Sequence, residues 1–173
     1  MLKTKMPPKG AGRSDIFQTE RGAVGIVLPY IPRSWTIWES ACGQRQIVRD
    51  IEDDGRKVVG TDIADGFDFM SPLASAQFQF DCIITNPPYS IKDAWLQRCF
   101  DIGKPFALLL PITALGEQGR VAMYRKNGIQ LILPPGRIQF TTPNGKEGGS
   151  WFYAAWFCHG LDLPSQITIP EAA

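Results

Sequence analysis

Apolar runs alternate with helix-length stretches along most of this 173-residue chain, and this alternation limits the folds that it can adopt. Strands are predicted over residues 35–39, 57–63, 80–85, 106–110, 129–133 and 151–158, with a short strand around Ile138. Helices are predicted over residues 22–31, 47–54, 91–102 and 114–127. Residues 106–110 are almost entirely apolar, as in strands that a parallel sheet buries on both faces. The repeated β-α-β order predicts an α/β protein with a doubly wound, mostly parallel sheet of about seven strands and a C-terminal antiparallel hairpin.

The length of the chain fits one domain with a buried core. Residues 1–14 carry four basic side chains among Pro, Gly and Ser and predict a flexible basic arm. This arm would either grip phosphates or act as a solubilising tail. Residues 15–173 are expected to form the single folded domain. The formal net charge of +1 provides no general attraction for a polyanion, so nucleic acid would have to be held by a local patch.

Cysteine and histidine usage argues against disulfides and metals. The four cysteines have no C-x-x-C spacing and predict free, buried thiols in a reducing compartment: Cys42, Cys82, Cys99 and Cys158. His159 is the one histidine and has no paired ligands, so no metal site is expected. No apolar stretch is long enough to span a membrane and the amino terminus lacks the apolar core of a signal peptide, which together predict a cytoplasmic protein.

The four residues Asn86, Pro87, Pro88 and Tyr89 directly follow the apolar run 80–85. The carboxyl end of a strand is where open α/β sheets place their chemistry. The prolines lack N–H groups, so the loop offers carbonyl acceptors without competing donors, and Asn86 and Tyr89 add an amide oxygen and a flat ring. Such a loop suits a planar group with an exocyclic amine, for example adenine. The alternative interpretation is a strand followed by a Pro-rich turn.

A second candidate site follows the first predicted strand. Residues 39–43 form a loop of small residues that begins with Glu39 and ends with Gly43, and Asp62 closes the next strand nineteen positions later. In a Rossmann-like sheet such a loop lets a nucleotide approach the backbone, and the later acid binds ribose hydroxyls. A loop with one glycine also fits a structural turn, but its combination with the later tetrad favours nucleotide binding.

These motifs together resemble the amino-group class of S-adenosylmethionine-dependent DNA methyltransferases. The resemblance covers about residues 15–158 and rests on residues 39–43, 61–63, 67–69 and 86–89. Small phage or prophage adenine-N6 methyltransferases are the most similar members. In such a setting, as in restriction-modification, methylation shields DNA from nucleases.

The resemblance implies S-adenosyl-L-methionine as the cofactor. Residues 15–19, Glu39 and Gly43 would contact its methionine part, Asp62 its ribose, and Asp68 with Phe69 its adenine. Asp68 and Phe69 also fit an exposed acid and a core aromatic in a loop. The full set of cofactor residues implied is Phe17, Thr19, Glu39, Ala41, Gly43, Asp62, Ile63, Asp68, Phe69 and Asn86.

The catalytic residues implied are Asn86, Pro87, Pro88 and Tyr89. Methyl transfer would be direct, with Asn86 Oδ1 and the Pro87 carbonyl accepting the two hydrogens of the target amine. Tyr89 would stack on the base, which must be flipped out of a duplex. Two positions depart from the family pattern, which has Pro where this chain has Ser40 and Gly where it has Arg45. The Arg45 side chain would either crowd the cofactor or pair with its carboxylate.

The chain has no room for a separate target-recognition segment between Tyr89 and the strand at residues 106–110. Target selectivity would then be low, would cover only a short target sequence, or would be supplied by a partner or by a second copy in a homodimer. The cations available to contact DNA, or RNA, are Arg120, Arg125, Arg137 and Lys146, the last in the loop 141–150. Each also fits a solvated surface charge. Arg137 is the strongest candidate because it precedes the apolar Ile138 and Phe140 near the expected substrate side.

Three functional hypotheses follow from the sequence. The first is a DNA adenine-N6 methyltransferase. The second is a methyltransferase for another planar amine, namely adenine in RNA, cytosine N4 or a protein glutamine, because the same acceptor pair would serve each of them. The third is a non-catalytic scaffold that has lost cofactor affinity through Ser40 and Arg45.

Overall fold

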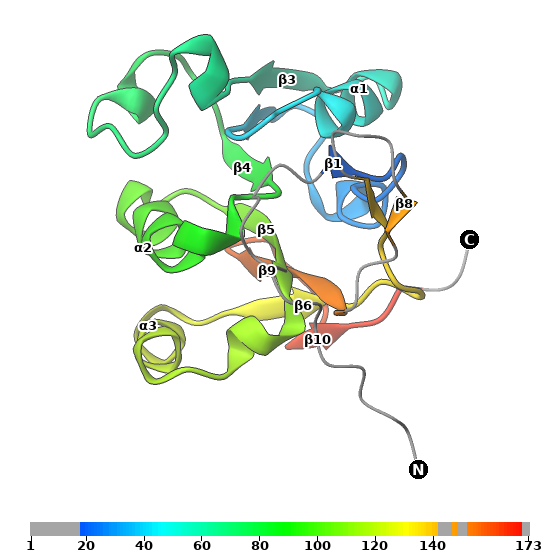
Figure 1. The fold of residues 1–173 in the computed structure, drawn as a ribbon, viewed down its shortest axis with the longest axis vertical. Helices are drawn as coiled ribbons and strands as arrows, with labels where there is room; N and C mark the ends of the chain where they lie inside the picture. Colours follow the sequence, from blue (N-terminus) through cyan, green and yellow to red (C-terminus); the bar gives the residue numbers. More distant parts are fainter. Residues whose placement is uncertain (1–17, 142–146, 149–151, 171–173) are drawn as a thin grey trace.

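A computed structural model describes residues 18–141, 147–148 and 152–170, and its main element is a seven-stranded sheet of order β10-β6-β9-β5-β4-β2-β3 (Figure 1). Every strand of this sheet except β9 runs in the same direction, and β9 is antiparallel to both of its neighbours. The strands are β2 (Thr36–Glu39), β3 (Lys57–Gly60), β4 (Cys82–Thr85), β5 (Phe106–Pro111), β6 (Gln130–Ile132), β9 (Ala154–His159) and β10 (Ile167–Thr168).

A small second sheet of order β1-β7-β8 lies on the same side of the main sheet as α1 (Figure 1). Its strands are β1 (Gln18–Thr19), β7 (Phe140–Thr141) and β8 (Glu147–Gly148), and its pairs are antiparallel. Thr19 is the register partner of Phe140. The pairing therefore brings together two parts of the chain that are more than a hundred residues apart.

Helices cover both faces of the main sheet, as expected for a doubly wound fold. Figure 1 shows α1 (Gln46–Asp53) on one side and α2 (Lys92–Ile102) and α3 (Gln118–Asn127) on the other. The strand residues alternate accordingly: Ile84 packs in the core on the α1 side, while Ile83 packs in the core with Trp95 and Leu96 of α2. Short 3-10 helices occupy Leu28–Tyr30, Ile63–Asp65, Ala74–Ala76, Tyr89–Ile91 and Ile112–Leu115.

The main α/β architecture confirms the sequence prediction, and three local predictions are wrong. Residues 22–31 are turns and one 3-10 helix rather than an α-helix, since Gly22 has a φ of 81° and Pro29 lacks the N–H that helix continuation requires. The strand predicted over 57–63 ends at Gly60, after which Asp62 caps a 3-10 helix. The helix predicted over 114–127 is divided, because Glu117 is extended and caps α3 with its side chain.

The C-terminal region differs from the predicted hairpin in its connection. β6 and β9 are antiparallel neighbours as expected, but the chain between them passes through the small sheet. The strand expected around Ile138 is β7, which belongs to that small sheet. The seventh strand of the main sheet is β10, which the sequence pattern did not predict. Residues 1–17, including the basic arm, and Trp151 lie outside the described residues.

The four cysteines are free and buried, which confirms that part of the prediction. Trp156 is fully buried and its indole N–H donates to the Ala23 carbonyl at 3.1 Å, so it anchors the segment 22–31 on the sheet. No helix in the described part of the chain has both the length and the apolar character needed to cross a bilayer.

Candidate functional site

The carboxyl ends of β2 and β4 lie side by side at the point where the strand order reverses. β2 pairs with β3 on one side and with β4 on the other, so the connections that leave the two strands diverge. Ligands of open α/β sheets bind in the crevice that forms at such a point. The last residue of β2 is Glu39 and the last residue of β4 is Thr85, and the Thr85 hydroxyl donates a short hydrogen bond to Glu39 Oε1.

Glu39 is a deeply buried carboxyl group. Its residue is 1% exposed, and Oε1 also accepts a hydrogen bond from the backbone N–H of Ala41 at 3.3 Å. Burial raises the pKa of Glu39 to about 8, although the hydrogen bonds from Thr85 and Ala41 oppose this shift. At neutral pH the group is therefore mostly a neutral acid, and a cation placed beside it would favour its ionisation.

Asp62 connects the loop after β2 to the end of β3. Its Oδ2 accepts from the backbone N–H of Gly43 at 2.7 Å, and its Oδ1 accepts from the N–H of Ala64 at 2.9 Å. A carboxylate has about four acceptor positions, so Asp62 keeps capacity for ligand hydroxyl groups. Asp62 thus contacts the glycine loop, residues 40–45 between β2 and α1, directly through Gly43.

The glycine loop is closed on one side by β1. Gln18 Oε1 accepts from the backbone N–H of Gln44 at 3.0 Å. Gly43 has a φ of 46°, and a Cβ at this position would lie 2.8 Å from Gln18 Nε2. A larger residue here would displace the end of the Gln18 side chain and would be strained by the positive φ, which glycine adopts readily. In this structure Gln18 and Asp62 therefore occupy two backbone N–H groups that the loop would otherwise offer to a ligand.

Arg45 adopts the left-handed conformation that glycine adopts most easily. Its φ is 65° and its ψ is 26°, and it is the one non-glycine residue with positive φ in the described part of the chain. The Arg45 side chain is directed toward the end of β3, where its Nη1 lies 3.1 Å from a Cβ built on Gly60. It also lies close enough to Glu39 to lower the pKa of that carboxyl. Arg45 therefore places a cation at the rim of the site.

Two polar atoms of the loop after β4 are buried and have no partner among the described residues. Asn86 Nδ2 donates to Thr19 Oγ1 at 3.1 Å, but no described group pairs with Asn86 Oδ1. The Tyr89 hydroxyl is likewise buried and unpaired within the described residues, and burial raises the pKa of Tyr89. Its ring meets Phe140 and Phe152 edge-on, at centroid distances of 6.4 and 5.7 Å. Unpaired buried polar groups are costly, so their presence favours a polar ligand here.

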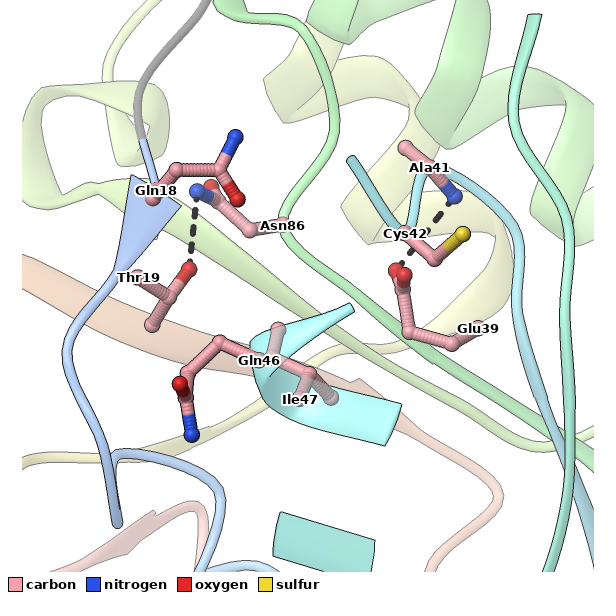
Figure 2. A pocket seen from close by; sticks show the side chains of 8 residues that line it. All are labelled: Gln18, Thr19, Glu39, Ala41, Cys42, Gln46, Ile47 and Asn86. Atoms are coloured by element: carbon pink, nitrogen blue, oxygen red, sulfur yellow. Dashed lines mark hydrogen bonds between the residues drawn. The ribbon is translucent and has the colours of Figure 1, made fainter. Parts of the chain in front are cut away.

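A small cavity of about 20 Å³ separates the two halves of the site (Figure 2). Figure 2 shows Glu39 with its Ala41 contact on one side and Asn86 bonded to Thr19 on the other. The cavity has room for about one water molecule. A larger ligand would require Gln18 or its neighbours to move. The lining residues are Gln18, Thr19, Glu39, Ala41, Cys42, Gln46, Ile47 and Asn86.

The structure brings most of the predicted cofactor residues together. Four of them line the cavity: Thr19, Glu39, Ala41 and Asn86. Gly43 lies beside the cavity, where its N–H donates to Asp62 and its backbone lies close to the Gln18 side chain. Ile63 follows Asp62 and is 69% exposed, so its apolar side chain is open to a flat ligand. Asp68 is also exposed, with Oδ1 accepting from the N–H of Met70 at 2.8 Å. Phe17 lies outside the described residues.

Two predicted site residues belong to the packed interior instead. Phe69 is 2% exposed and stacks on Trp95 at 4.3 Å, so its ring is the core aromatic of the alternative interpretation. Arg120 was expected on the surface, which is wrong because its side chain is 8% exposed. Its guanidinium is held by Asp93 at 2.6 Å and by the Ala114 carbonyl at 2.8 Å. This geometry removes Arg120 from the candidate phosphate contacts.

Arg137 lies at the same edge of the sheet as the loop of residues 86–89. Its guanidinium carbon is 4.6 Å from the ring centroid of Tyr153, which is 58% exposed. Tyr153 directly precedes β9, whose first residue pairs with the carboxyl end of β5. Arg125, by contrast, is in the last turn of α3, which leads to the amino end of β6 and away from the site. Lys146 lies outside the described residues.

Thr85 is a site residue that the sequence analysis did not single out. It is fully buried, and its hydroxyl bonds to Glu39, forty-six residues earlier. The available signal was a hydroxyl group at the end of an otherwise apolar strand, directly before Asn86. Phe140 and Phe152 were also missed as neighbours of Tyr89, because nothing local in the sequence connects them.

Comparisons with known proteins give limited similarity. No family model matches the chain, and no curated protein matches it. Among solved structures, the chain is similar to a TehB-like SAM-dependent methyltransferase from Corynebacterium glutamicum, with a TM-score of 0.42 and 15% identity over 80% of this chain and 87% of that chain. The roles of the residues in this chain therefore rest on their own geometry.

Replacement of Glu39 by Gln is expected to remove a pH-dependent loss of stability. The folded state keeps the Glu39 proton up to about pH 8, whereas an unfolded chain releases it near 4.5, so the stability that this group contributes is lost as the pH rises through that window. Between these pH values the free energy of unfolding of Glu39→Gln, relative to that of wild type, should rise by up to about 1.4 kcal/mol per pH unit. Urea unfolding at several pH values measures the difference. Glu52→Gln, at an exposed position of α1, is the control, and pH profiles that stay parallel for Glu39→Gln and wild type would contradict this assignment.

Arg45→Gly is expected to be more stable than Arg45→Ala. Both variants lose the guanidinium, but only glycine relieves the left-handed backbone at φ 65°. The difference in the free energy of unfolding should be about 1 kcal/mol in favour of glycine. Thermal or urea unfolding of the two variants measures it, and equal stabilities would show that the conformation carries no strain.

Proposed function

We propose that this chain is an S-adenosylmethionine-dependent methyltransferase that transfers a methyl group to the exocyclic N6 amine of adenine in DNA. The observation that carries the proposal is that Glu39, which is buried, and Asn86, whose Oδ1 is buried, lie on opposite sides of one cavity at the switch point of the sheet. One residue offers a carboxyl group for a cationic ligand. The other offers an unpaired amide oxygen for an amine donor.

The residues present fit the chemistry of this cofactor. Glu39 would pair with the ammonium group of its methionine part, and Asp62 would accept hydrogen bonds from its ribose hydroxyls. Ile63, exposed beside Asp62, would contact the flat adenine. Arg45 at the rim would pair with the carboxylate of the methionine part, which is the one of its two expected roles that permits binding. When bound, S-adenosylmethionine supplies an electrophilic methyl group on a sulfonium centre.

The loop of residues 86–89, which we take as the catalytic loop, would act by positioning the target amine. Asn86 Oδ1 and the Pro87 carbonyl would accept the two hydrogens of the target amine, which turns the nitrogen lone pair toward the methyl group. In that position the acceptor nitrogen would take the methyl group that the cofactor supplies, and the methylated amine would then release one proton to solvent. Tyr89 would contact the face of the base, and Arg137 would contact the nucleic acid backbone at the same edge of the sheet.

Asn86→Ala is expected to abolish methyl transfer while cofactor binding persists. The variant removes the acceptor that orients the amine, so transfer should fall by about a hundredfold or more. Transfer of labelled methyl groups to adenine-containing DNA measures the rate, and titration calorimetry measures cofactor affinity. Asn127→Ala is the matched control, because that amide bonds to the Met123 carbonyl in α3, away from the site.

The same assay separates the competing functions. Asp62→Ala should weaken cofactor binding itself, unlike Asn86→Ala. Transfer to RNA, to cytosine or to a protein glutamine in place of DNA adenine would reassign the substrate but keep the reaction. A wild-type protein that binds no cofactor, with or without DNA, would instead indicate a non-catalytic scaffold in which Gln18 stays bonded to the Gln44 N–H.

Cofactor affinity is expected to rise with pH between about pH 6 and pH 8. Free Glu39 holds its proton up to about pH 8, and pairing with an ammonium group requires its release. The dissociation constant should therefore fall by up to about tenfold per pH unit, with proton release on binding. Calorimetry in buffers of different ionisation enthalpy counts the proton. Glu39→Gln should bind more weakly and without this pH dependence, and a pH-independent wild-type affinity would exclude the mechanism.

A further inference from the structure

We infer that Thr19 is a positioning residue that holds the Asn86 amide from its nitrogen end, so that Oδ1 faces the acceptor amine. The inference rests on the proposed function and deepens it, since it names the group that orients the catalytic amide. It starts from the contact between Asn86 Nδ2 and Thr19 Oγ1 at 3.1 Å (Figure 2).

An asparagine amide presents two ends of opposite character. The nitrogen donates two hydrogens and the oxygen only accepts. An amine whose hydrogens must be accepted is repelled by the nitrogen end and bound by the oxygen end. A partner at the nitrogen end therefore leaves the oxygen end facing the amine. In this structure Asn86 Nδ2 bonds to Thr19, and Asn86 Oδ1 is buried with no partner among the described residues.

Thr19 is itself fixed more firmly than its place near the start of the described chain would imply. It is 6% exposed and pairs in register with Phe140 of β7. Phe140 in turn packs edge-on against Tyr89. One strand pair thus contacts both substrate-facing residues of the loop: Thr19 contacts Asn86, and Phe140 contacts Tyr89.

The neighbouring residue of β1 does not share this role. Gln18 bonds to the backbone of Gln44 in the glycine loop, whereas Thr19 bonds to Asn86. Both side chains line the same cavity, but their hydrogen bonds are made to different loops, one after β2 and the other after β4. A change at Thr19 should therefore act on methyl transfer more than on the glycine loop.

The test compares Thr19→Val, Thr19→Ser and wild type in the full chain. Valine keeps the shape of threonine but cannot accept a hydrogen bond, and serine keeps the hydroxyl. Thr168→Val is the matched control, because Thr168 is also 6% exposed in a two-residue strand but lies at the far edge of the sheet. The measurements are the single-turnover rate of methyl transfer to an adenine-containing oligonucleotide, the dissociation constant of S-adenosylmethionine, and the side-chain amide resonance of Asn86.

Thr19→Val should lower the transfer rate by about tenfold or more, and by a larger factor than it raises the cofactor dissociation constant. Thr19→Ser should restore most of the rate, and Thr168→Val should leave it unchanged. The Asn86 amide resonance should move in Thr19→Val and stay in place in Thr168→Val. An unmoved resonance, a wild-type rate in Thr19→Val, or equal losses of rate and cofactor affinity would each overturn the inference.

Failure of the proposed function gives a different result. Wild-type protein would then transfer no methyl group to any acceptor, whatever residue stands at position 19. The amide resonance would still report whether Thr19 orients Asn86, because that measurement needs no turnover.

Discussion

The hydrogen bond between Thr85 and Glu39 is the contact on which the rest of the site depends. It joins the ends of two adjacent parallel strands, β2 and β4, at the point where the sheet order reverses. A carboxyl group that is 1% exposed needs partners, because burial of an unpaired polar group is costly. Since Thr85 is followed directly by Asn86, the bond that satisfies the acid also fixes the start of the loop of residues 86–89. The distance between the two candidate binding elements is therefore set by the sheet and not by flexible side chains.

The small sheet provides the second constraint. β1 is only two residues long, yet Gln18 contacts the glycine loop and Thr19 contacts Asn86. Its pairing with β7 places Phe140 against Tyr89. The main sheet thus fixes where the two loops begin, and β1 with β7 contacts both of them through side chains. Such a closed arrangement excludes water from Glu39, which is the physical cause of its raised pKa.

The sequence predicted the parts of the site that depend on local pattern. Strands ending in Glu39 and Thr85, with Asn86 directly after the second, follow from apolar runs bounded by polar residues, because parallel strands place their carboxyl ends at one edge. The parts that failed depend on contacts between distant residues. Arg120 is buried because Asp93 of α2 reaches it, Phe69 is buried because Trp95 stacks on it, and a two-residue strand such as β1 has no periodicity of its own. The left-handed backbone of Arg45 could not be predicted either, since arginine has no preference for it.

The unpaired polar atoms argue for a ligand at this site more strongly than for a scaffold. A buried acceptor without a partner costs about 1–3 kcal/mol, and both Asn86 Oδ1 and the Tyr89 hydroxyl are in this state within the described residues. A loop that served only to connect β4 and α2 would be more stable with an apolar side chain at either position. A ligand that donates to Asn86 recovers part of this cost on binding, so the same atoms that weaken the free protein strengthen the complex. This gain would be made in the cavity of about 20 Å³ between Asn86 and Glu39. A ligand group that enters it would bind best if it donated a hydrogen bond to the Asn86 amide oxygen and placed a positive charge beside the Glu39 carboxyl group.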